Sequence, residues 1–93
     1  MEFDWDDGNR NKCAKHGLTP AEIEAFFRLR PRVALDVRHS VKEQRFAAIG
    51  RDKTGRAIFA AFCWRGKKIR PVSVRYMHER EVRKYEKSTD NDN

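Results

Sequence analysis

Two apolar runs joined by a glycine turn constrain the fold of this chain more than any other feature. The runs cover residues 56–64 and 69–76, and Arg65-Gly66 follows the first. Glycine accepts the positive φ that a two-residue hairpin loop needs, so the sequence predicts an antiparallel hairpin closed by Arg65-Gly66. The first run is apolar on both faces, which is typical of a central strand. Pro71 lacks a backbone donor and therefore predicts a sheet edge or a local bulge.

The length of this loop predicts which residues of the hairpin face each other. With Arg65-Gly66 as the loop, Trp64 faces Lys67, Phe62 faces Ile69, Ile58 faces Ser73 and Arg56 faces Arg75. Like charges in opposed positions destabilise a sheet. The paired arginines therefore favour an anionic group between them, and phosphate is the simplest candidate.

The clearest helix start in the chain lies at Thr19. Thr19 is a typical N-cap, Pro20 suits the first helical position, and Glu22 completes a capping box, with Leu18 stapled to Ile23. The other predicted elements are a strand at 2–5, a helix from Asp6 or Asp7 to Lys15 or His16, strands at 33–37 and 43–50, a turn at 52–55, and a final helix from 77.

This order predicts one α+β domain over residues 1–87, followed by a frayed polar tail at 88–93. The expected sheet has four to five mainly antiparallel strands. Two N-terminal helices and one C-terminal helix should pack against one face of that sheet.

The charge of the chain points to an acidic partner. The formal net charge is +7, and residues 28–87 hold nearly all of the excess. Nucleic acid is the leading partner and an acidic protein the next, while a merely solvated basic surface is the alternative. No run is long and apolar enough for a membrane span, and the acidic start is unlike a signal peptide, so a cytoplasmic location is expected. Cys13 and Cys63 lack metal-site spacing and are expected to be small buried side chains.

Several short motifs in order resemble the BrnT family of ribonuclease toxins from bacterial type II toxin–antitoxin modules. They are Phe3-Asp4-Trp5-Asp6, Lys15-His16-Gly17, Glu43, Arg45-Phe46, Gly50, Gly55-Arg56 and Ile69-Arg70-Pro71-Val72-Ser73-Val74-Arg75. The resemblance implies a RelE-like fold and an endoribonuclease of the mRNA interferase type that uses no metal or other cofactor. It also implies a cognate antitoxin, and binding of promoter DNA by the toxin–antitoxin complex.

RNA cleavage by attack of a 2′-hydroxyl needs proton removal, stabilisation of an anionic phosphorane, and protonation of the leaving oxygen. Arginine suits the second task, so Arg56 and Arg75 are the main candidates and Arg45 is a third. Glu43 could accept a proton or only neutralise a neighbouring arginine. His16 could act in acid–base chemistry, although an imidazolium at a helix end is an ordinary structural feature.

Six further residues are candidates for RNA binding. Ser73 and Tyr76 could donate hydrogen bonds to phosphate, and the cations Lys15, Lys67, Lys68 and Arg70 could bind the backbone in a salt-sensitive way. Two other functions fit the same residues. The chain could be a nucleic-acid-binding module without catalysis, or an antitoxin-like interaction partner whose basic surface serves another protein.

Overall fold

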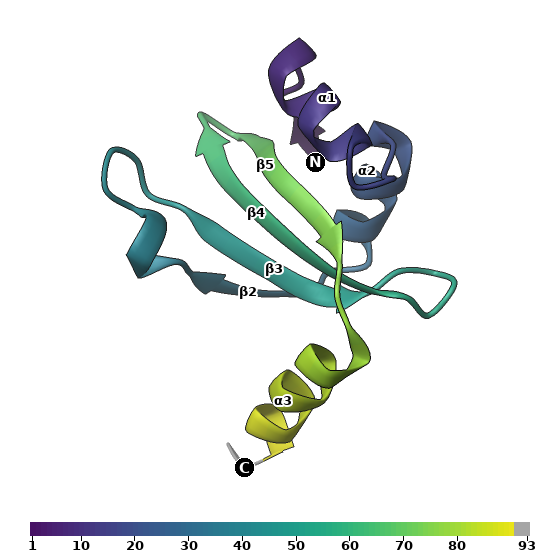
Figure 1. Ribbon diagram of the computed structural model, residues 1–93. Coiled ribbons are helices and arrows are strands. Elements are labelled where there is room, and N and C mark those ends of the chain that lie inside the picture. Colours follow the sequence, from purple (N-terminus) through teal and green to yellow (C-terminus); the bar gives the residue numbers. More distant parts are fainter. Residues whose placement is uncertain (91–93) are drawn as a thin grey trace.

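The computed structural model describes residues 1–90 of the chain and has the element order that the sequence predicts (Figure 1). The elements are β1 (Glu2–Phe3), α1 (Asp7–Ala14), α2 (Pro20–Arg28), β2 (Arg32–Leu35), the short 3-10 helix η1 (Val37–His39), β3 (Phe46–Arg51), β4 (Ala57–Arg65), β5 (Lys68–Tyr76) and α3 (Glu79–Asp90). The expected tail at 88–93 therefore falls partly within α3, and residues 91–93 lie outside the described residues.

The five strands form one mixed sheet in the order β1-β5-β4-β3-β2. β1 pairs with β5 in parallel, and the other three pairings are antiparallel. The α+β class, the three helices and the central position of β4 are thus confirmed. Within the described residues, no helix is long and apolar enough to cross a membrane.

The N-terminal helices begin where the sequence places them. Thr19 accepts a hydrogen bond from the Glu22 amide, and the Glu22 carboxylate accepts one from the Thr19 amide, so the predicted capping box is present. Asp6 caps α1 in the same way with Asn9 as its partner. Gly17 follows α1 at a φ of 82°, a conformation that side chains disfavour.

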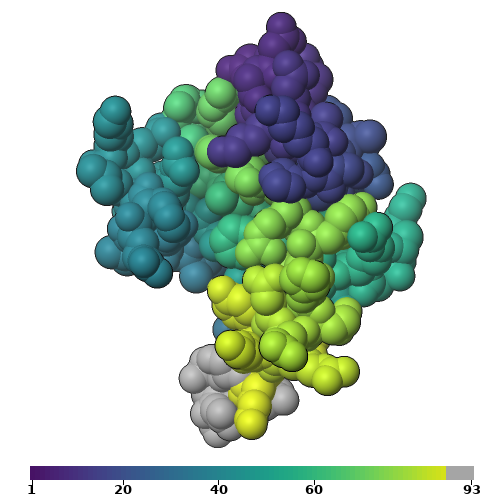
Figure 2. All heavy atoms as spheres, in the orientation of Figure 1, coloured from purple at the N-terminus to yellow at the C-terminus, as the bar shows by residue number. Residues whose placement is uncertain are grey.

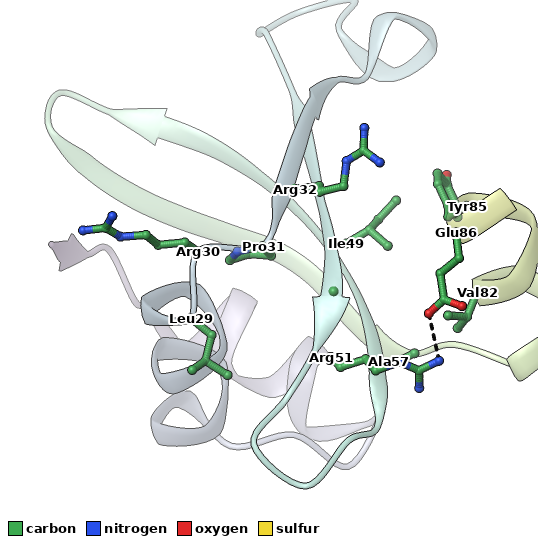
Figure 3. A pocket seen from close by; sticks show the side chains of 11 residues that line it. Leu29, Arg30, Pro31, Arg32, Ile49, Arg51, Ala57, Val82, Tyr85 and Glu86 are labelled. Atoms are coloured by element: carbon green, nitrogen blue, oxygen red, sulfur yellow. Dashed lines mark hydrogen bonds and ion pairs between the residues drawn. The ribbon is translucent and has the colours of Figure 1, made fainter. Parts of the chain in front are cut away.

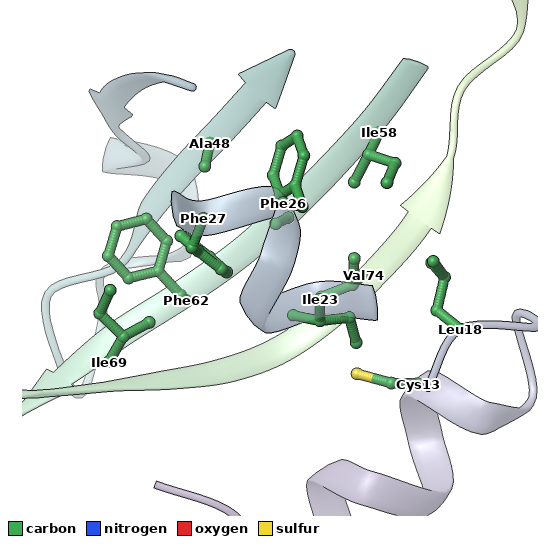
Figure 4. Close-up of a cluster of buried hydrophobic side chains, with 11 residues drawn as sticks. Cys13, Leu18, Ile23, Phe26, Phe27, Ala48, Ile58, Phe62, Ile69 and Val74 are labelled. Carbon is green, nitrogen blue, oxygen red and sulfur yellow. The ribbon is translucent and has the colours of Figure 1, made fainter. Parts of the chain in front are cut away.

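The main core lies between α1 and α2 and one face of the sheet, which we call the core face (Figure 4). Phe27 of α2 meets Phe62 of β4 edge-on, with ring centroids 5.2 Å apart. Cys13 is fully buried in this cluster, and Cys63 is buried on β4, so both are small interior side chains as expected.

The third helix packs against the opposite sheet face, so the expectation that all helices share one face is wrong. Val82 of α3 forms a second cluster with Ala57 and Met77, against which Ile49 and Phe59 pack. The physical reason is the alternation of side chains along a strand. β3 and β4 carry apolar residues on both faces, and each face then needs a cover. We call this second side the open face, because α3 covers only one end of it.

The predicted hairpin register is also wrong, and with it the opposition of Arg56 and Arg75. The turn consists of Gly66 and Lys67, since Arg65 pairs with Lys68. Trp64 pairs with Ile69, and Phe62 pairs with Pro71. Further along the hairpin, Phe59 pairs with Arg75 and Ile58 with Tyr76. Gly66, at a φ of 62°, takes the first central position of the turn instead of the second.

A bulge shifts the register again near the middle of β5. The shift falls between Ala61 and Phe62, whose partners are Ser73 and Pro71, so Val72 is the extra residue. A bulge at Pro71 was one of the two predicted alternatives. β5 is covered along only part of its outer side, since β1 pairs with Lys68 and Ile69 alone.

Candidate basic pocket on the open sheet face

Four cations from different elements line a pocket on the part of the open face that α3 leaves uncovered. Lys12 comes from α1, Arg45 directly precedes β3, Arg65 ends β4 and Arg70 lies on β5. Glu43 and Cys63 also line this pocket, which encloses about 300 Å³. We call it the basic pocket.

The strand register brings three of these residues into one row. Cys63 pairs with Arg70, and Phe46 pairs with Phe62, so Arg45 and Arg70 flank Cys63 on its two neighbouring strands. Arg65 lies two residues beyond Cys63 and therefore on the same face. The Arg45 backbone is fixed at both ends, because its amide donates to Ser40 Oγ at 2.9 Å and its carbonyl accepts from the Asp36 amide at 2.8 Å.

The bulge extends this row along β5. Without the extra Val72, Arg70 and Ser73 would point to opposite faces, because their numbers differ by three. With it, Ser73 and Arg75 lie on the same face as Arg70. The buried Asn9 holds the bulge in place, since its Nδ2 donates to the Pro71 carbonyl at 2.8 Å and to the Asp4 carbonyl at 3.0 Å.

The four cations differ in how far carboxylates neutralise them. Arg70 binds Asp6 at 2.8 Å and Asp4 at 3.5 Å, and the hydrogen bond that Arg70 donates to Asp6 raises the pKa of Arg70. Arg65 forms an ion pair with Glu43.

Among the described residues, the side chains of Arg45 and Lys12 form no hydrogen bond or ion pair. An added anion would thus meet two cations that no carboxylate neutralises. Burial raises the pKa of the Cys63 thiol, although Arg70 and Arg45 act in the other direction, so this side chain stays protonated beside the arginines.

A second hollow continues the basic pocket toward the loop between β2 and β3. It encloses about 440 Å³, shares Glu43 and Arg45 with the basic pocket, and adds Arg38, His39 and Lys42. In Figure 2 the residues of this loop form a teal lobe at the left of the molecule. The two hollows form what we call the basic trough, which is lined by cationic side chains from both hollows.

The structure gathers some of the predicted site residues and separates others. Glu43, Arg45 and Arg70 line the basic pocket. Ser73 and Arg75 share its face, and Lys68 pairs with Arg65 at its rim. Arg75 lies nearer to α3, where Glu81 binds both of its terminal nitrogens at 3.1 and 3.2 Å.

The remaining candidates lie away from the basic pocket. Arg56 precedes β4, and its guanidinium stacks 3.4 Å above the centre of the Tyr76 ring, which packs against the main core. Arg75 instead lies over Phe59 of the other cluster. Because Arg75 and Tyr76 are adjacent on β5, the two arginines contact opposite faces of the sheet. Lys15 and His16 follow α1, and Lys67 is in the hairpin turn.

Sequence reasoning missed Arg65 and Lys12. Arg65 was assigned to the turn, where its side-chain direction cannot be predicted, and Lys12 looked like an ordinary exposed helix residue. Counting charge on alternate positions of the corrected strand would have found Arg65. No pattern within α1 marks Lys12, since its position depends on how the helix packs beside β5.

A third hollow lies under α3 and is mainly apolar (Figure 3). It encloses about 310 Å³ between the segment that joins α2 to β2, strand β3, and the Val82 and Tyr85 side of α3. Arg51 spans its rim and binds Glu79 at 3.2 Å and Glu86 at 3.1 Å. Arg51 is thus already paired, and the mainly apolar lining of the hollow offers less to an anion than the basic pocket does.

Comparison with known proteins gives one match. The model of a protein family described as the ribonuclease toxin BrnT of type II toxin–antitoxin systems matches residues 5–81. No curated protein and no solved structure matches the chain. Within the described residues, no three His, Cys, Asp or Glu side chains are placed to hold a metal ion together.

Proposed function

The chain belongs to the BrnT family of ribonuclease toxins of type II toxin–antitoxin systems, and we propose that it cleaves RNA in the basic pocket. The observation that carries this proposal is the convergence of Lys12, Arg45, Arg65 and Arg70 beside Glu43 on an uncovered sheet face. A ribonuclease needs a place where cations surround a phosphate and a proton acceptor lies within reach. The basic pocket combines both, and the adjoining hollow shares its Glu43 and Arg45.

In the proposed reaction, Arg45 and Arg65 hold the scissile phosphate. Arg45 is without an ion-pair partner in the described residues, and Arg65 can exchange the Glu43 carboxylate for a phosphate oxygen. The planar guanidinium forks bind two phosphoryl oxygens and remain charged while the phosphorane gains negative charge. Arg70 stays paired with Asp6 and contributes mainly a positive field.

Glu43, released from Arg65, accepts the proton of the RNA 2′-hydroxyl. The 2′-oxygen forms a bond to phosphorus, and the bond from phosphorus to the 5′-oxygen breaks. Lys12 gives a proton to the departing 5′-oxygen, since the arginines of the pocket hold theirs too tightly. The products are a 2′,3′-cyclic phosphate and a free 5′-hydroxyl.

The basic trough also suits a toxin that is neutralised by a partner. A cognate antitoxin with an acidic segment would compete with RNA for Arg38, Lys42 and Arg45. Binding of promoter DNA is then a property of the complex, because the antitoxin occupies the trough. We also propose a cytoplasmic location, where cellular RNA is found, and a RelE-like fold.

A cleavage assay on labelled single-stranded RNA in the presence of a chelator tests this proposal. Arg45→Ala is expected to lower the cleavage rate by roughly 100-fold, the usual cost of losing one donor to a developing anion. Arg80→Ala removes the same charge from the exposed face of α3 and should cleave like the wild type. Expression of the chain alone should arrest bacterial growth, and co-expression of the antitoxin should restore it.

Two other outcomes of these experiments would contradict the proposal. Loss of cleavage in Arg56→Ala but not in Arg45→Ala would move the active site to the start of β4 near Tyr76. Salt-dependent RNA binding with no cleavage by any preparation would favour the non-catalytic binding module.

A further inference from the structure

Strand β2 is exposed along its whole length and carries two apolar residues. All four residues of β2 are exposed, and Val33 and Leu35 are 54% and 47% accessible. β2 is the last strand of the sheet on that side, so its outer peptide groups have no strand partner. Edge strands of soluble proteins are often protected by short length, charged side chains, proline or a bulge. β2 is short and begins with the charged Arg32, but it has no proline and no bulge within its bounds.

The register with β3 identifies the peptide groups that face outward. The Asp36 amide donates to the Arg45 carbonyl, so these opposed residues form a hydrogen-bonded pair. Such pairs alternate along an antiparallel ladder, which makes Ala34 and Arg32 the next residues bonded to β3. The amides and carbonyls of Val33 and Leu35 therefore point away from the sheet.

The sequence of this edge is complementary to itself. Residues 32–36 read Arg-Val-Ala-Leu-Asp, with opposite charges at the ends and small or branched apolar residues between them. When two copies of β2 are placed antiparallel about Ala34, Val33 of one copy lies opposite Leu35 of the other, and Arg32 lies opposite Asp36. Arg32 also has a contact within its own chain, and the Asp36 carboxylate binds His39 Nδ1 at 2.9 Å, so the charges across the junction add to contacts that each copy already makes. We propose that a second copy of this chain docks on β2, so that the two sheets join into one continuous sheet across a twofold axis at Ala34.

The complementarity fixes the register as well as the partner. In the pairing centred on Ala34, Val33 of each copy exchanges both backbone hydrogen bonds with Leu35 of the other copy. This pairing uses every peptide group of the strand that points outward. A shift by two residues would leave half of these groups unpaired and would remove the opposition of unlike charges. The charges thus act mainly as a selector of register, and the backbone and apolar contacts supply the attraction.

The proposed dimer keeps the two basic troughs on the same side. The twofold axis runs perpendicular to the sheet, so each open face continues into the other. Arg45 is the partner of Asp36 across β2 and β3, and it lies on the open face near the junction. One RNA chain could therefore contact both copies, whereas Val33 and Leu35 pack against each other on the core face.

Cysteine cross-linking tests the register directly. Ala34 opposes itself at a position without ladder bonds, where the Cα atoms of antiparallel strands lie about 4.5 Å apart, within the reach of a disulfide. Ala34→Cys is expected to form a disulfide-linked dimer under mild oxidation. Val33→Cys is the matched control, because its opposite is Leu35 and its own copy lies about 7 Å away or more. The native Cys13 and Cys63 are buried and should not react.

A charge exchange tests the same pairing without a disulfide. Sedimentation of the wild type over a range of concentrations should show a monomer–dimer equilibrium. Arg32→Asp alone and Asp36→Arg alone oppose like charges at two symmetric positions and should weaken dimerisation roughly tenfold. The double variant restores opposite charges and should recover dimerisation, which a merely damaged strand would not do. Circular dichroism confirms that each variant is folded.

Three results would overturn the inference. The first is a wild type that remains monomeric at every concentration and an Ala34→Cys variant that does not cross-link. The second is a dimer that survives Leu35→Lys, since this dimer would use another surface. The third is a monomer whose Leu35→Lys variant loses the cognate antitoxin, because the edge would then belong to that partner. None of these readouts depends on RNA cleavage.

Discussion

The guanidinium of Arg65 forms an ion pair with the carboxylate of Glu43 at the mouth of the basic pocket. Glu43 precedes β3, whereas Arg65 ends β4, so the contact ties the loop between β2 and β3 to the hairpin. Both side chains are more than two-fifths exposed, and an exposed pair of this kind contributes about 1 kcal/mol or less to stability. Breaking this ion pair therefore costs little free energy, and an RNA phosphate can displace the Glu43 carboxylate from Arg65.

Glu43→Gln is expected to abolish most of the cleavage while leaving the fold intact. The amide cannot take the 2′-hydroxyl proton, and losing a general base costs about 100-fold or more in rate. The free energy of unfolding in urea should change by less than about 1 kcal/mol. Glu86→Gln removes a carboxylate from Arg51 outside the pocket and is the matched control. Equal rates for the two variants would exclude Glu43 as the proton acceptor.

The affinity for RNA should fall steeply as the salt concentration rises, and Arg65 should account for a measurable part of this dependence. Each phosphate contact on a single strand contributes about 0.7 to the slope of log affinity against log salt concentration. Arg65→Ala should flatten the slope by roughly that amount when binding of a non-cleavable 2′-deoxy oligonucleotide is measured. Arg80→Ala should keep the wild-type slope. An unchanged slope for Arg65→Ala would mean that this residue does not contact phosphate.

Asn9→Ala should be among the most destabilising polar substitutions in the chain. The Asn9 side chain is buried and bonds the backbone of Asp4, Asp6 and Pro71, so its loss leaves the Pro71 carbonyl without its donor. Leaving such a group unsatisfied costs about 1 to 3 kcal/mol. Asn11→Ala, on the exposed side of the same helix, should change stability by about 0.5 kcal/mol or less. Urea unfolding measures both, and similar losses would contradict the role of Asn9.

The fold should lose stability in acid partly through Asp6. Hydrogen bonds from the Asn9 amide and from Arg70 lower the pKa of Asp6 in the folded state. A lowered folded pKa means that the stabilisation is complete above the unfolded value of 3.8 and is lost as the pH falls through the folded value.

Asp6→Asn separates this charge effect from capping, because asparagine also caps helices well. The variant should melt below the wild type at neutral pH, and the two melting temperatures should converge as the pH drops below about 4. A difference that persists unchanged in acid would assign the effect to the cap geometry instead of the charge.

The sequence predicted best the features that depend on neighbouring residues. The start of α2 follows from Thr19, Pro20 and Glu22 alone, and the capping box formed as expected. The order of the elements follows from apolar periodicity and stop signals, which are also local. The central place of β4 follows from its composition, since a strand that is apolar on both faces needs a neighbour on each side.

The site depended on geometry that no short pattern contains. Gly66 was compatible with either of two turn positions, and a different choice moves every partner along the hairpin. The bulge at Val72 then changes the side to which Arg70 points relative to Arg75. Because of the actual turn position and the bulge, Arg56 does not lie at the site and Arg65 does. Lys12 joined only because Asn9 fixes α1 beside β5.

The position of α3 at one end of the open face has a consequence for how the protein opens. In the part of this helix whose side chains are described, the contacts with the sheet include the packing of Val82 and ion pairs to Arg51 and Arg75. The backbone amides of this helix should therefore exchange with deuterated solvent through local detachment, long before the β3-β4-β5 ladder unfolds. Detachment would expose Phe59 and Ile49 and release Arg75 from Glu81. The uncovered area of the open face and the number of unpaired arginines on it would then increase, while the main core stays intact.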